Sequence, residues 1–391
     1  MRQKPSIVLA AVLAAFTPVA LGDDAPRRLR VSPDRAGSAA VVVPIAAPLV
    51  HTTQFFPIDE AGRLAPEDRQ IETVLDRLDA ALRAAGSDAS RVVRMHVVLS
   101  RADWRDEVRK AFAKRLDGRD GPAWTFVGGE PLRPGAILAV DAVATTDHAP
   151  PPNTAPRSAT SAVLPGGPRV FISGQAEPDA DLAVATRKTL ESLGDSLKTL
   201  GLDRDRVVQL KAFIQPSDAP AAEVVAREVA AFFEGETPPP LVVVGWKSSP
   251  SQPVEIELIA ASHSPGGSGR LEFPALPPLK PSPVYSRAAL ASQGSLVFVS
   301  GLIGPENAPG GDQVRAVFDE LRSVLDEARS DFRHMAKATY YVSDPEADAA
   351  LAKIRTELYD PTRPPAASKA AVRDVAFPGR GFAIDMIAVT P

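Results

Sequence analysis

Residues 170–174 read Val-Phe-Ile-Ser-Gly, and residues 297–301 read Val-Phe-Val-Ser-Gly. Residues 49–53, Leu-Val-His-Thr-Thr, have the same build, in which apolar, β-favouring residues end in two small polar ones. A proline follows each run within a few residues, at Pro57, Pro178 and Pro305. One pattern that recurs three times in a chain of 391 residues indicates an internal repeat.

The elements after each run also recur in a fixed order. First comes a helix with apolar residues at i, i+3, i+4 and i+7 spacing: Ile71, Val74, Leu75, Leu78 and Leu82; Leu190, Leu193, Leu197 and Leu200; Val314, Val317, Phe318, Leu321, Val324 and Leu325. Next comes a strand, at residues 92–99, 207–214 and 335–342, and then an amphipathic stretch, at 104–116, 221–233 and 347–358. Each block ends with a proline-led strand and a last strand, the latter at 138–144, 254–260 and 382–388. The order β-hairpin, α, β, α, β, β predicts an α+β fold with both helices on one face of the sheet.

Proline-rich stretches divide the chain into three blocks. Residues 147–160 and 263–283 lack hydrophobic periodicity and concentrate proline, glycine and serine, as linkers do. We therefore predict module 1 at residues 40–146, module 2 at 161–262 and module 3 at 284–391. Each sheet has a face that its own two helices leave bare, so we expect the three modules to bury those faces against one another.

The N-terminus differs from the rest. Arg2 and Lys4 precede an apolar run from Ile7 to Leu21, and Ala20-Leu21-Gly22 supplies small residues before Asp23. Charge, a short apolar core and a small-residue end are typical of a cleaved signal peptide, here residues 1–22. The alternative, a membrane anchor, is less favoured because the run is short for a bilayer and contains Pro18. We expect an exported protein, periplasmic or extracellular, that is free of the membrane after cleavage.

The amino-acid composition excludes several classes of partner and active site. The formal net charge is −4 and no basic run is present, so the sequence predicts no nucleic-acid partner. Cysteine is absent, which excludes thiol nucleophiles and thiolate metal ligands. The histidines are scattered without metal-ligand spacing: His51, His96, His148, His263 and His334. We predict no metal and no cofactor.

Motifs of module 3 resemble the Rid family, also called RidA/YjgF or endoribonuclease L-PSP-like. The resemblance rests on Tyr285-Ser286-Arg287-Ala288, Val297 to Gly301, the Gln313-led helix, Lys337 to Val342, Arg363-Pro364-Pro365 and Ile384 to Val389. Residues 203–211 and 254–260 resemble the pattern in module 2, and module 1 resembles it more faintly. The resemblance implies three tandem chorismate-mutase-like modules that form an intramolecular pseudo-trimer, a monomer with ligand clefts between modules.

The resemblance also implies a deaminase-like hydrolase that releases ammonia from small enamines and imines of amino acids. In the family a cleft arginine binds the substrate carboxylate, and a glutamate on the last strand positions the attacking water. Without gaps, the arginine position falls on Trp124, Pro240 and Ala367, none of which can bind a carboxylate through its side chain. The glutamate position falls on Ala139, Glu255 and Ala383, so only module 2 keeps it.

Candidate residues follow from these positions. The catalytic candidates are Glu255, the family-like Tyr285, and Lys369, which lies two residues beyond Ala367 on the same strand face. The favoured alternative is that Lys369 is a solvated surface lysine on an irregular strand. The ligand-binding candidates are Trp124, Ser173, Gly174, Ser300 and Gly301.

Two functional classes stay open. One is an exported enzyme that hydrolyses imines or enamines. The other is a catalytically inactive ligand-binding or structural protein with apolar clefts, which lost the carboxylate-binding arginine. In either class the expected ligand is an imine, an enamine or another small carboxylate. An acid also recurs on the last strand, as Asp141, Glu257 and Asp385, and we interpret it as a shared structural pairing at the centre rather than three catalytic acids.

Overall fold

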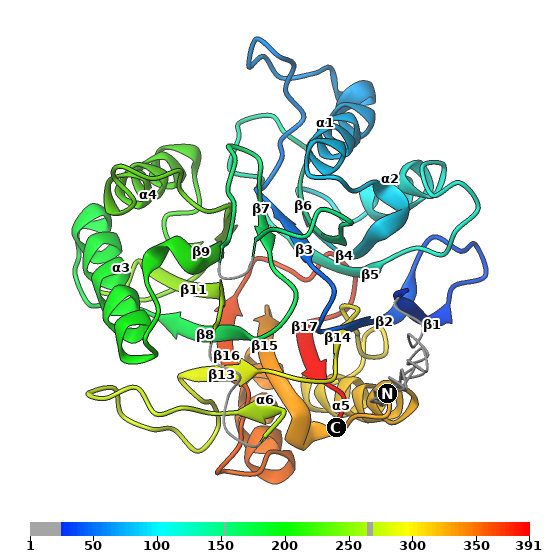
Figure 1. Cartoon of the computed structure of the whole chain (residues 1–391). Helices are drawn as coiled ribbons and strands as arrows, with labels where there is room; N and C mark the ends of the chain where they lie inside the picture. The colour runs from blue at the N-terminus through cyan, green and yellow to red at the C-terminus, as the bar shows by residue number, and fades with distance from the viewer. Residues whose placement is uncertain (1–24, 152–153, 264–268) are drawn as a thin grey trace, which may run out of the picture.

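The computed structural model describes residues 25–151, 154–263 and 269–391, and within these ranges the chain forms three β-sheets and six α-helices. The three sheets surround a common centre, and the helices lie outside them (Figure 1). The predicted signal peptide, residues 1–22, lies outside the described residues. No helix of the described ranges is long and apolar enough to cross a membrane.

The three modules repeat one order of elements. Module 1 contains β3 (Leu49–Thr52), α1 (Gln70–Ala84), β4 (Val92–Leu99), α2 (Trp104–Ala113), β5 (Ala123–Gly128) and β6 (Leu138–Thr145). Module 2 contains β8 (Arg169–Gln175), α3 (Leu182–Thr199), β9 (Val207–Ile214), α4 (Ala219–Phe232), β10 (Leu241–Gly245) and β11 (Val254–Ala261). Module 3 contains β14 (Ser295–Val299), α5 (Gly310–Glu327), β15 (Met335–Val342), α6 (Pro345–Leu358), β16 (Ala366–Ala371) and β17 (Phe382–Val389). The predicted α+β fold of three tandem modules is confirmed.

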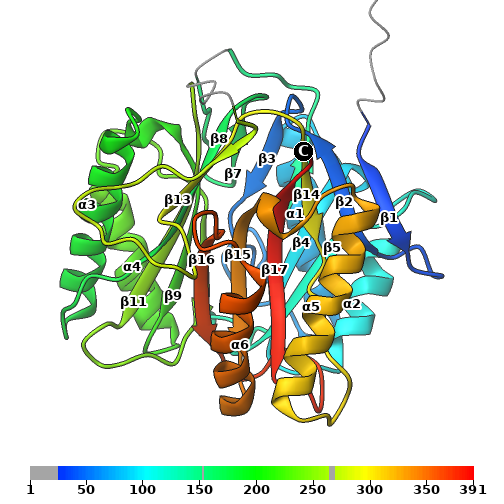
Figure 2. The ribbon, with the colours of Figure 1, turned by 90° about the horizontal axis from the view of Figure 1, so that it is seen from below.

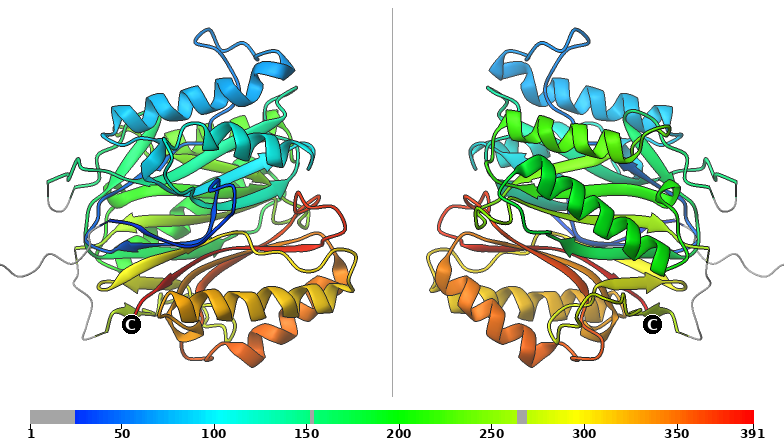
Figure 3. Two further views of the ribbon diagram at one scale, coloured as in Figure 1. Left: turned by 90° about the vertical axis from the view of Figure 1, so that its right-hand side faces the viewer. Right: turned by 90° about the vertical axis from the view of Figure 1, so that its left-hand side faces the viewer.

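Both helices of each module pack on one face of its sheet. Figure 3 shows α1 and α2 on one outer side of the molecule and α5 and α6 on the opposite side, and its right-hand view shows α3 and α4 over the third sheet. In Figure 2, α5 and α6 lie against β15 and β17. The apolar stripe predicted for α5 forms this contact, because Val314, Phe318 and Leu321 are at most 1% exposed.

The strand that leads into each module belongs to a neighbouring sheet. These leading strands are β2 (Ser38–Pro44), β7 (Ser161–Leu164) and β13 (Ala288–Ala291). β2 pairs with β14 of module 3, β7 with β3 of module 1, and β13 with β8 of module 2. The hairpin expected within each module is therefore wrong. Four residues between β2 and β3 turn the chain from one sheet into the next, and the alternation of apolar residues fixes the buried face but not the partner strand.

The exchange closes the molecule into a ring. The sheet orders are β5-β4-β6-β3-β7, β10-β9-β11-β8-β13-β12 and β1-β2-β14-β17-β15-β16, where β1 (Arg27–Val31) and β12 (Leu271–Glu272) are short additions before the leading strands. The inner faces of all three sheets share a buried apolar core that includes Val43, Phe171, Val208 and Phe298. Each module thus buries its bare face against the other two, as expected.

The recurring acids lie together at this centre. Asp141, Glu257 and Asp385 are at most 3% exposed. Asp141 is 2.6 Å from Nδ1 of His96, whose pKa is lowered chiefly by burial. The predicted structural pairing of these acids is confirmed.

Three buried cations neutralise the acids across module boundaries. Arg94 of module 1 donates from Nε to Asp385 of module 3 at 2.9 Å. Lys211 of module 2 lies 3.1 Å from the same carboxylate, and Lys337 of module 3 lies 2.8 Å from Glu257 of module 2. Burial acts to raise the pKa of Asp385, but the three cations outweigh it and hold that pKa well below its usual range. This central ion network therefore ties the modules together electrostatically.

Candidate clefts between the modules

The candidate clefts are the three junctions where the end of a module's first strand meets the edge strand of the next module. β8 of module 2 ends against β16 of module 3, β14 of module 3 against β5 of module 1, and β3 of module 1 against β10 of module 2. We call these the 2/3, 3/1 and 1/2 clefts. They arise from one repeated geometry, but their side chains differ.

Glu255 dominates the 2/3 cleft. Its Oε1 lies 2.0 Å from the point that a Cβ on Gly174 would occupy, so the carboxyl group covers the glycine backbone and needs a residue without a side chain there. The N–H of Gly174 donates to Oγ of Ser368 on β16 at 3.1 Å. Oγ of Ser173 is buried, and no residue of the described ranges hydrogen bonds to it.

Opposing effects act on the pKa of the Glu255 carboxyl group. Burial raises the pKa of Glu255 to about 7, although a hydrogen bond from Ser368 and the positive charges of Arg287 and Lys369 act to lower it. A carboxyl group with a pKa near neutrality can both accept and return a proton under ordinary conditions.

Module 3 supplies the opposite wall of the 2/3 cleft. The segment before β13 lies beside β16, since the N–H of Ser286 donates to the carbonyl of Pro365 at 2.9 Å. The carbonyl of Arg287 accepts from the N–H of Ser173 at 3.0 Å. The Arg287 guanidinium lies over the ring of Tyr285, 4.9 Å from its centroid.

Lys369 lies on β16 on the same strand face as Ala367. Its side chain is 40% exposed, and Nζ is 2.6 Å from Asp348 of α6. The structure thus brings Glu255, Tyr285 and Lys369 to one cleft, together with the ligand-binding candidates of module 2. An incoming carboxylate would have to compete with Asp348 for Lys369.

The 3/1 cleft has no acid at the glutamate position, because Ala383 occupies it. Oγ of Ser300 accepts from the N–H of Trp124 at 2.8 Å, and the N–H of Gly301 donates to the Trp124 carbonyl at 2.6 Å. The remaining ligand-binding candidates, Trp124, Ser300 and Gly301, therefore meet here, away from Glu255. They border a cavity of about 310 Å³.

The 1/2 cleft is closed by hydrogen bonds between its walls. Gln54 inserts its side-chain amide between strands: Nε2 donates to the carbonyl of Val243 at 3.2 Å, and Oε1 accepts from its N–H at 3.3 Å. The Gln54 N–H also donates to the Leu241 carbonyl at 3.3 Å. No candidate residue was assigned to this cleft.

Strand pairing corrects one sequence alignment. Ala123 lies opposite Arg94, Ala366 lies opposite Lys337, and Leu241 lies opposite Leu210. Because Leu210 is one residue beyond the equivalent of Arg94, the residue that matches Trp124 and Ala367 is Leu241 and not Pro240. Leucine also lacks a group that binds carboxylates.

Sequence reasoning missed Arg287 as a cleft cation. The residue stands inside the quoted motif, two positions after Tyr285, so strand alternation alone could have placed both side chains on one face. Ser368 was missed because nothing in an alanine-rich stretch marks a serine as a cleft residue.

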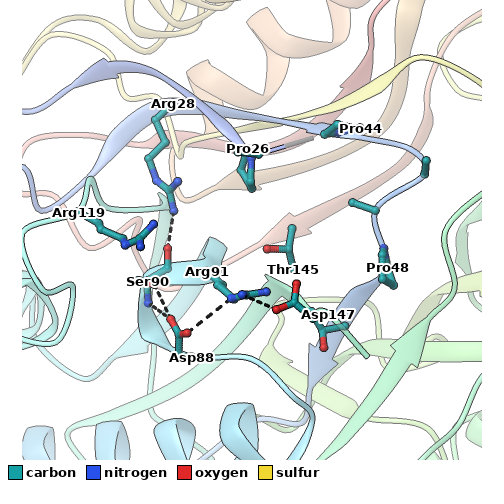
Figure 4. A pocket seen from close by; sticks show the side chains of 14 residues that line it. Pro26, Arg28, Pro44, Pro48, Asp88, Ser90, Arg91, Arg119, Thr145 and Asp147 are labelled. Atoms are coloured by element: carbon teal, nitrogen blue, oxygen red, sulfur yellow. Dashed lines mark hydrogen bonds and ion pairs between the residues drawn. The ribbon is translucent and has the colours of Figure 1, made fainter. Parts of the chain in front are cut away.

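A separate pocket of about 550 Å³ lies between the start of the described chain and module 1. In Figure 4 it is bordered by Arg28, Arg91 and Arg119, and Arg91 pairs with Asp147 at 2.5 Å. Arg28 donates to the carbonyl of Ser90 at 3.0 Å. None of the predicted site residues lines this pocket. Among the described residues no group of three or more histidines, aspartates and glutamates could hold a metal ion.

Comparison with known proteins gives a family match over more than half of the chain. The family model described as Endoribonuclease L-PSP matches residues 38–146 and 277–390. No curated protein matches. Solved structures that match include a Rid-family protein from Yersinia pestis, at 22% identity over 31% of this chain and 95% of that one, with a TM-score of 0.28. A putative endoribonuclease from Thermotoga maritima matches at 27% identity over 31% of this chain and 98% of that one, with a TM-score of 0.24.

Proposed function

Because the chain belongs to the Rid/YjgF (endoribonuclease L-PSP) family, we propose that its 2/3 cleft binds small imines or enamines that carry a carboxylate and hydrolyses them to keto acids and ammonia. The observation that carries the proposal is the placement of Glu255, whose pKa is raised to about 7, beside the cations Arg287 and Lys369. The 3/1 and 1/2 clefts hold alanine where module 2 holds this glutamate.

The residues of the cleft suggest a division of labour. Arg287 and Lys369 would hold the substrate carboxylate, with Lys369 exchanging Asp348 for it. Glu255 would take a proton from water as the oxygen attacks the imine carbon, and would then return that proton to the nitrogen. Transfer of the hydroxyl proton of the tetrahedral adduct to its amino group, with cleavage of the carbon–nitrogen bond, releases ammonia and leaves the keto acid, so one water is consumed per imine.

The test uses 2-aminoacrylate and 2-iminobutanoate generated enzymatically in the assay, with ammonia or keto-acid release as the readout. We expect Glu255→Gln to lower kcat/KM by about a hundredfold or more, because a positioned acid–base group contributes roughly 10²–10⁴. We expect Arg287→Met to act mainly by raising KM. The matched control is Lys353→Met on the exposed side of α6, whose side chain is 79% exposed. Full activity of Glu255→Gln would refute the assignment.

One observation favours binding without turnover. Ala367 stands at the family arginine position, and Lys369 is already paired with Asp348 at 2.6 Å. The two possibilities separate when binding of 2-oxobutanoate, a stable keto acid, is measured by calorimetry beside the kinetic assay. Binding that is weakened by Arg287→Met, without turnover of either imine, would establish the inactive ligand-binding alternative.

Export is part of the same proposal. Cleavage after Gly22 would leave Asp23 as the first residue, and N-terminal sequencing of protein recovered from a bacterial periplasm tests this directly.

A further inference from the structure

The cavity of the 3/1 cleft is built from six separate parts of the chain. It is lined by the β1–β2 region, helix α2, strand β5, the segment after β14, Glu320 of helix α5, and the loop that carries Phe377. Its volume of about 310 Å³ is at the small end of the range for ligand pockets. Since a water molecule takes about 30 Å³, the space suits a ligand of roughly ten heavy atoms.

Aromatic rings form one wall of this cavity. Trp124 stacks on Phe126 with ring centroids 5.4 Å apart and an interplanar angle of 4°. Phe377 meets Phe126 edge-on at 6.2 Å. The Trp124 ring packs so closely on the β1–β2 turn that a Cβ on Gly37 would lie 2.8 Å from it, which explains the glycine there. The wall is therefore rigid and suited to a flat ring.

Guanidinium groups of helix α2 form the rim. Arg105 and Arg109 are one helical turn apart and face the same side. Arg105 lies over Phe377 at 4.3 Å from the ring centroid and is paired with Asp106. Arg109 donates from Nη2 to Ser32 at 3.3 Å, and Asp34 is 3.6 Å from the same nitrogen.

The guanidinium group of Arg109 is not fully hydrogen bonded. Its Nε is buried without a hydrogen-bond partner and is not accessible to a ligand, whereas Nη1 is not among the buried atoms and makes no hydrogen bond to any residue in the described part of the chain. The other cation of the lining, Arg30, is occupied by Glu320 and Glu327, both at 2.7 Å. An unmet guanidinium donor next to an aromatic wall favours a ligand that carries both an anionic oxygen and a ring.

The same cleft has no acid at the position of Glu255, and the carboxylate in its lining, Glu320, is paired with Arg30 at 2.7 Å. Ala383 occupies the position of Glu255, and the hydroxyl of Ser300 is engaged by the backbone of Trp124 on both sides, at 2.8 and 3.0 Å. A ligand would therefore be held and not converted.

We propose that the 3/1 cleft is a second, non-catalytic site that binds a small aromatic carboxylate, with its ring against Trp124, Phe126 and Phe377 and its carboxylate on Arg109. The proposal does not depend on hydrolysis in the 2/3 cleft, because the two sites share no residue. It differs from the family arrangement in taking its arginine from α2, since Trp124 replaces the strand arginine.

Calorimetric titration of the intact protein with phenylacetate tests the proposal, with phenylacetamide as the neutral analogue and acetate as the analogue without a ring. We expect saturable binding of phenylacetate and binding at least about tenfold weaker for each analogue. Arg109→Met should raise the Kd of phenylacetate by about tenfold or more, whereas the matched control Arg187→Met, on exposed α3, should leave it within about twofold.

Two further variants separate the clefts. Glu255→Gln should leave phenylacetate binding unchanged, because it alters only the 2/3 cleft. Phe377→Leu, at a partly exposed position, should weaken phenylacetate binding and leave the thermal unfolding midpoint close to that of the parent protein. Absence of saturable phenylacetate binding, equal binding of phenylacetamide, or loss of binding in Glu255→Gln would each overturn the proposal.

Discussion

Residue 255 is a carboxyl where the equivalent residues of the other modules, Ala139 and Ala383, have only a methyl group. Where alanine is present, the neighbouring strand end bonds directly to the backbone of the next module, as Gly301 does to Trp124. Where Glu255 is present, its side chain covers Gly174, and that glycine bonds to the hydroxyl of Ser368 instead. One side chain thus distinguishes the 2/3 cleft, which has a carboxyl group at this position, from the other two, which have none there.

The raised pKa of Glu255 predicts a pH-dependent cost in stability. Its folded pKa of about 7 lies above the ordinary value of 4.5, so the folded state holds the extra proton between these values and stability falls as pH rises through the window. Glu255→Gln, which mimics the neutral form, should therefore gain in melting temperature relative to the parent protein from about pH 5 to about pH 8. Scanning calorimetry at both pH values measures this.

The control for that comparison is Glu223→Gln on an exposed position of α4. The difference in melting temperature between Glu223→Gln and the parent protein should stay constant across the same pH range. The assigned pKa direction would be contradicted if the melting temperatures of both variants shifted equally relative to the parent protein. It would also be contradicted if the advantage in melting temperature of Glu255→Gln became smaller as pH rises.

At the scale of elements, the linkers are fastened to the modules that follow them. Arg157 of the linker at residues 147–160 donates to the carbonyls of Val207 at 2.9 Å and Thr237 at 3.0 Å, and its guanidinium lies over Phe233 at 5.1 Å. Arg28 of the segment before module 1 donates in the same way to Val92, the equivalent of Val207, at 3.1 Å. Both arginines join a leading segment to the start of a module's second strand.

Removing this contact should destabilise the whole chain. Arg157 is only 5% exposed, so Arg157→Met would leave the carbonyl of the buried Val207 without this donor, at a cost of about 1–3 kcal/mol in the free energy of unfolding. Arg227→Met on α4, where the side chain is 66% exposed, should change it by less than about 0.5 kcal/mol. Urea denaturation compares the two, and equal midpoints would show that the linker contact contributes nothing.

The elements also show what sequence patterns can and cannot specify. Helical periodicity predicted the buried stripe of α5, because a 3.6-residue repeat defines a face without reference to any partner. The exchange of β2 into the sheet of β14 was missed, because a strand's alternation is the same whichever strand it pairs with. The recurring acid predicted a central pairing, but the cations repeat only in part: Arg94 and Lys337 occupy equivalent strand positions, whereas Lys211 lies two residues further along its strand.

At the scale of the molecule, the modules meet through a buried network that carries three acids and three cations. Lys211 and Arg94 come from two modules and converge on Asp385 of the third. Burying charges is costly, and a well-packed apolar centre could be equally stable. The ion pairs add specificity, because each cation pairs with an acid on a particular neighbouring module. We therefore infer that the network determines which module lies next to which around the ring.

Replacing Asp385, the acid that two cations share, should strongly lower the free energy of unfolding. Asp385→Asn removes the carboxylate that pairs with the buried Lys211 and leaves Arg94 with Asp141 alone, at 3.5 Å, and we expect a loss of about 3–5 kcal/mol in the free energy of unfolding at neutral pH. Because the folded pKa of Asp385 is depressed, its contribution is complete above the unfolded pKa of about 4 and disappears as pH falls further, so parent and variant should converge in acid. Urea denaturation at several pH values measures this, with Asp195→Asn, an exposed pair on α3, as the control. If both variants lost equally little, the modules would be held by apolar packing alone.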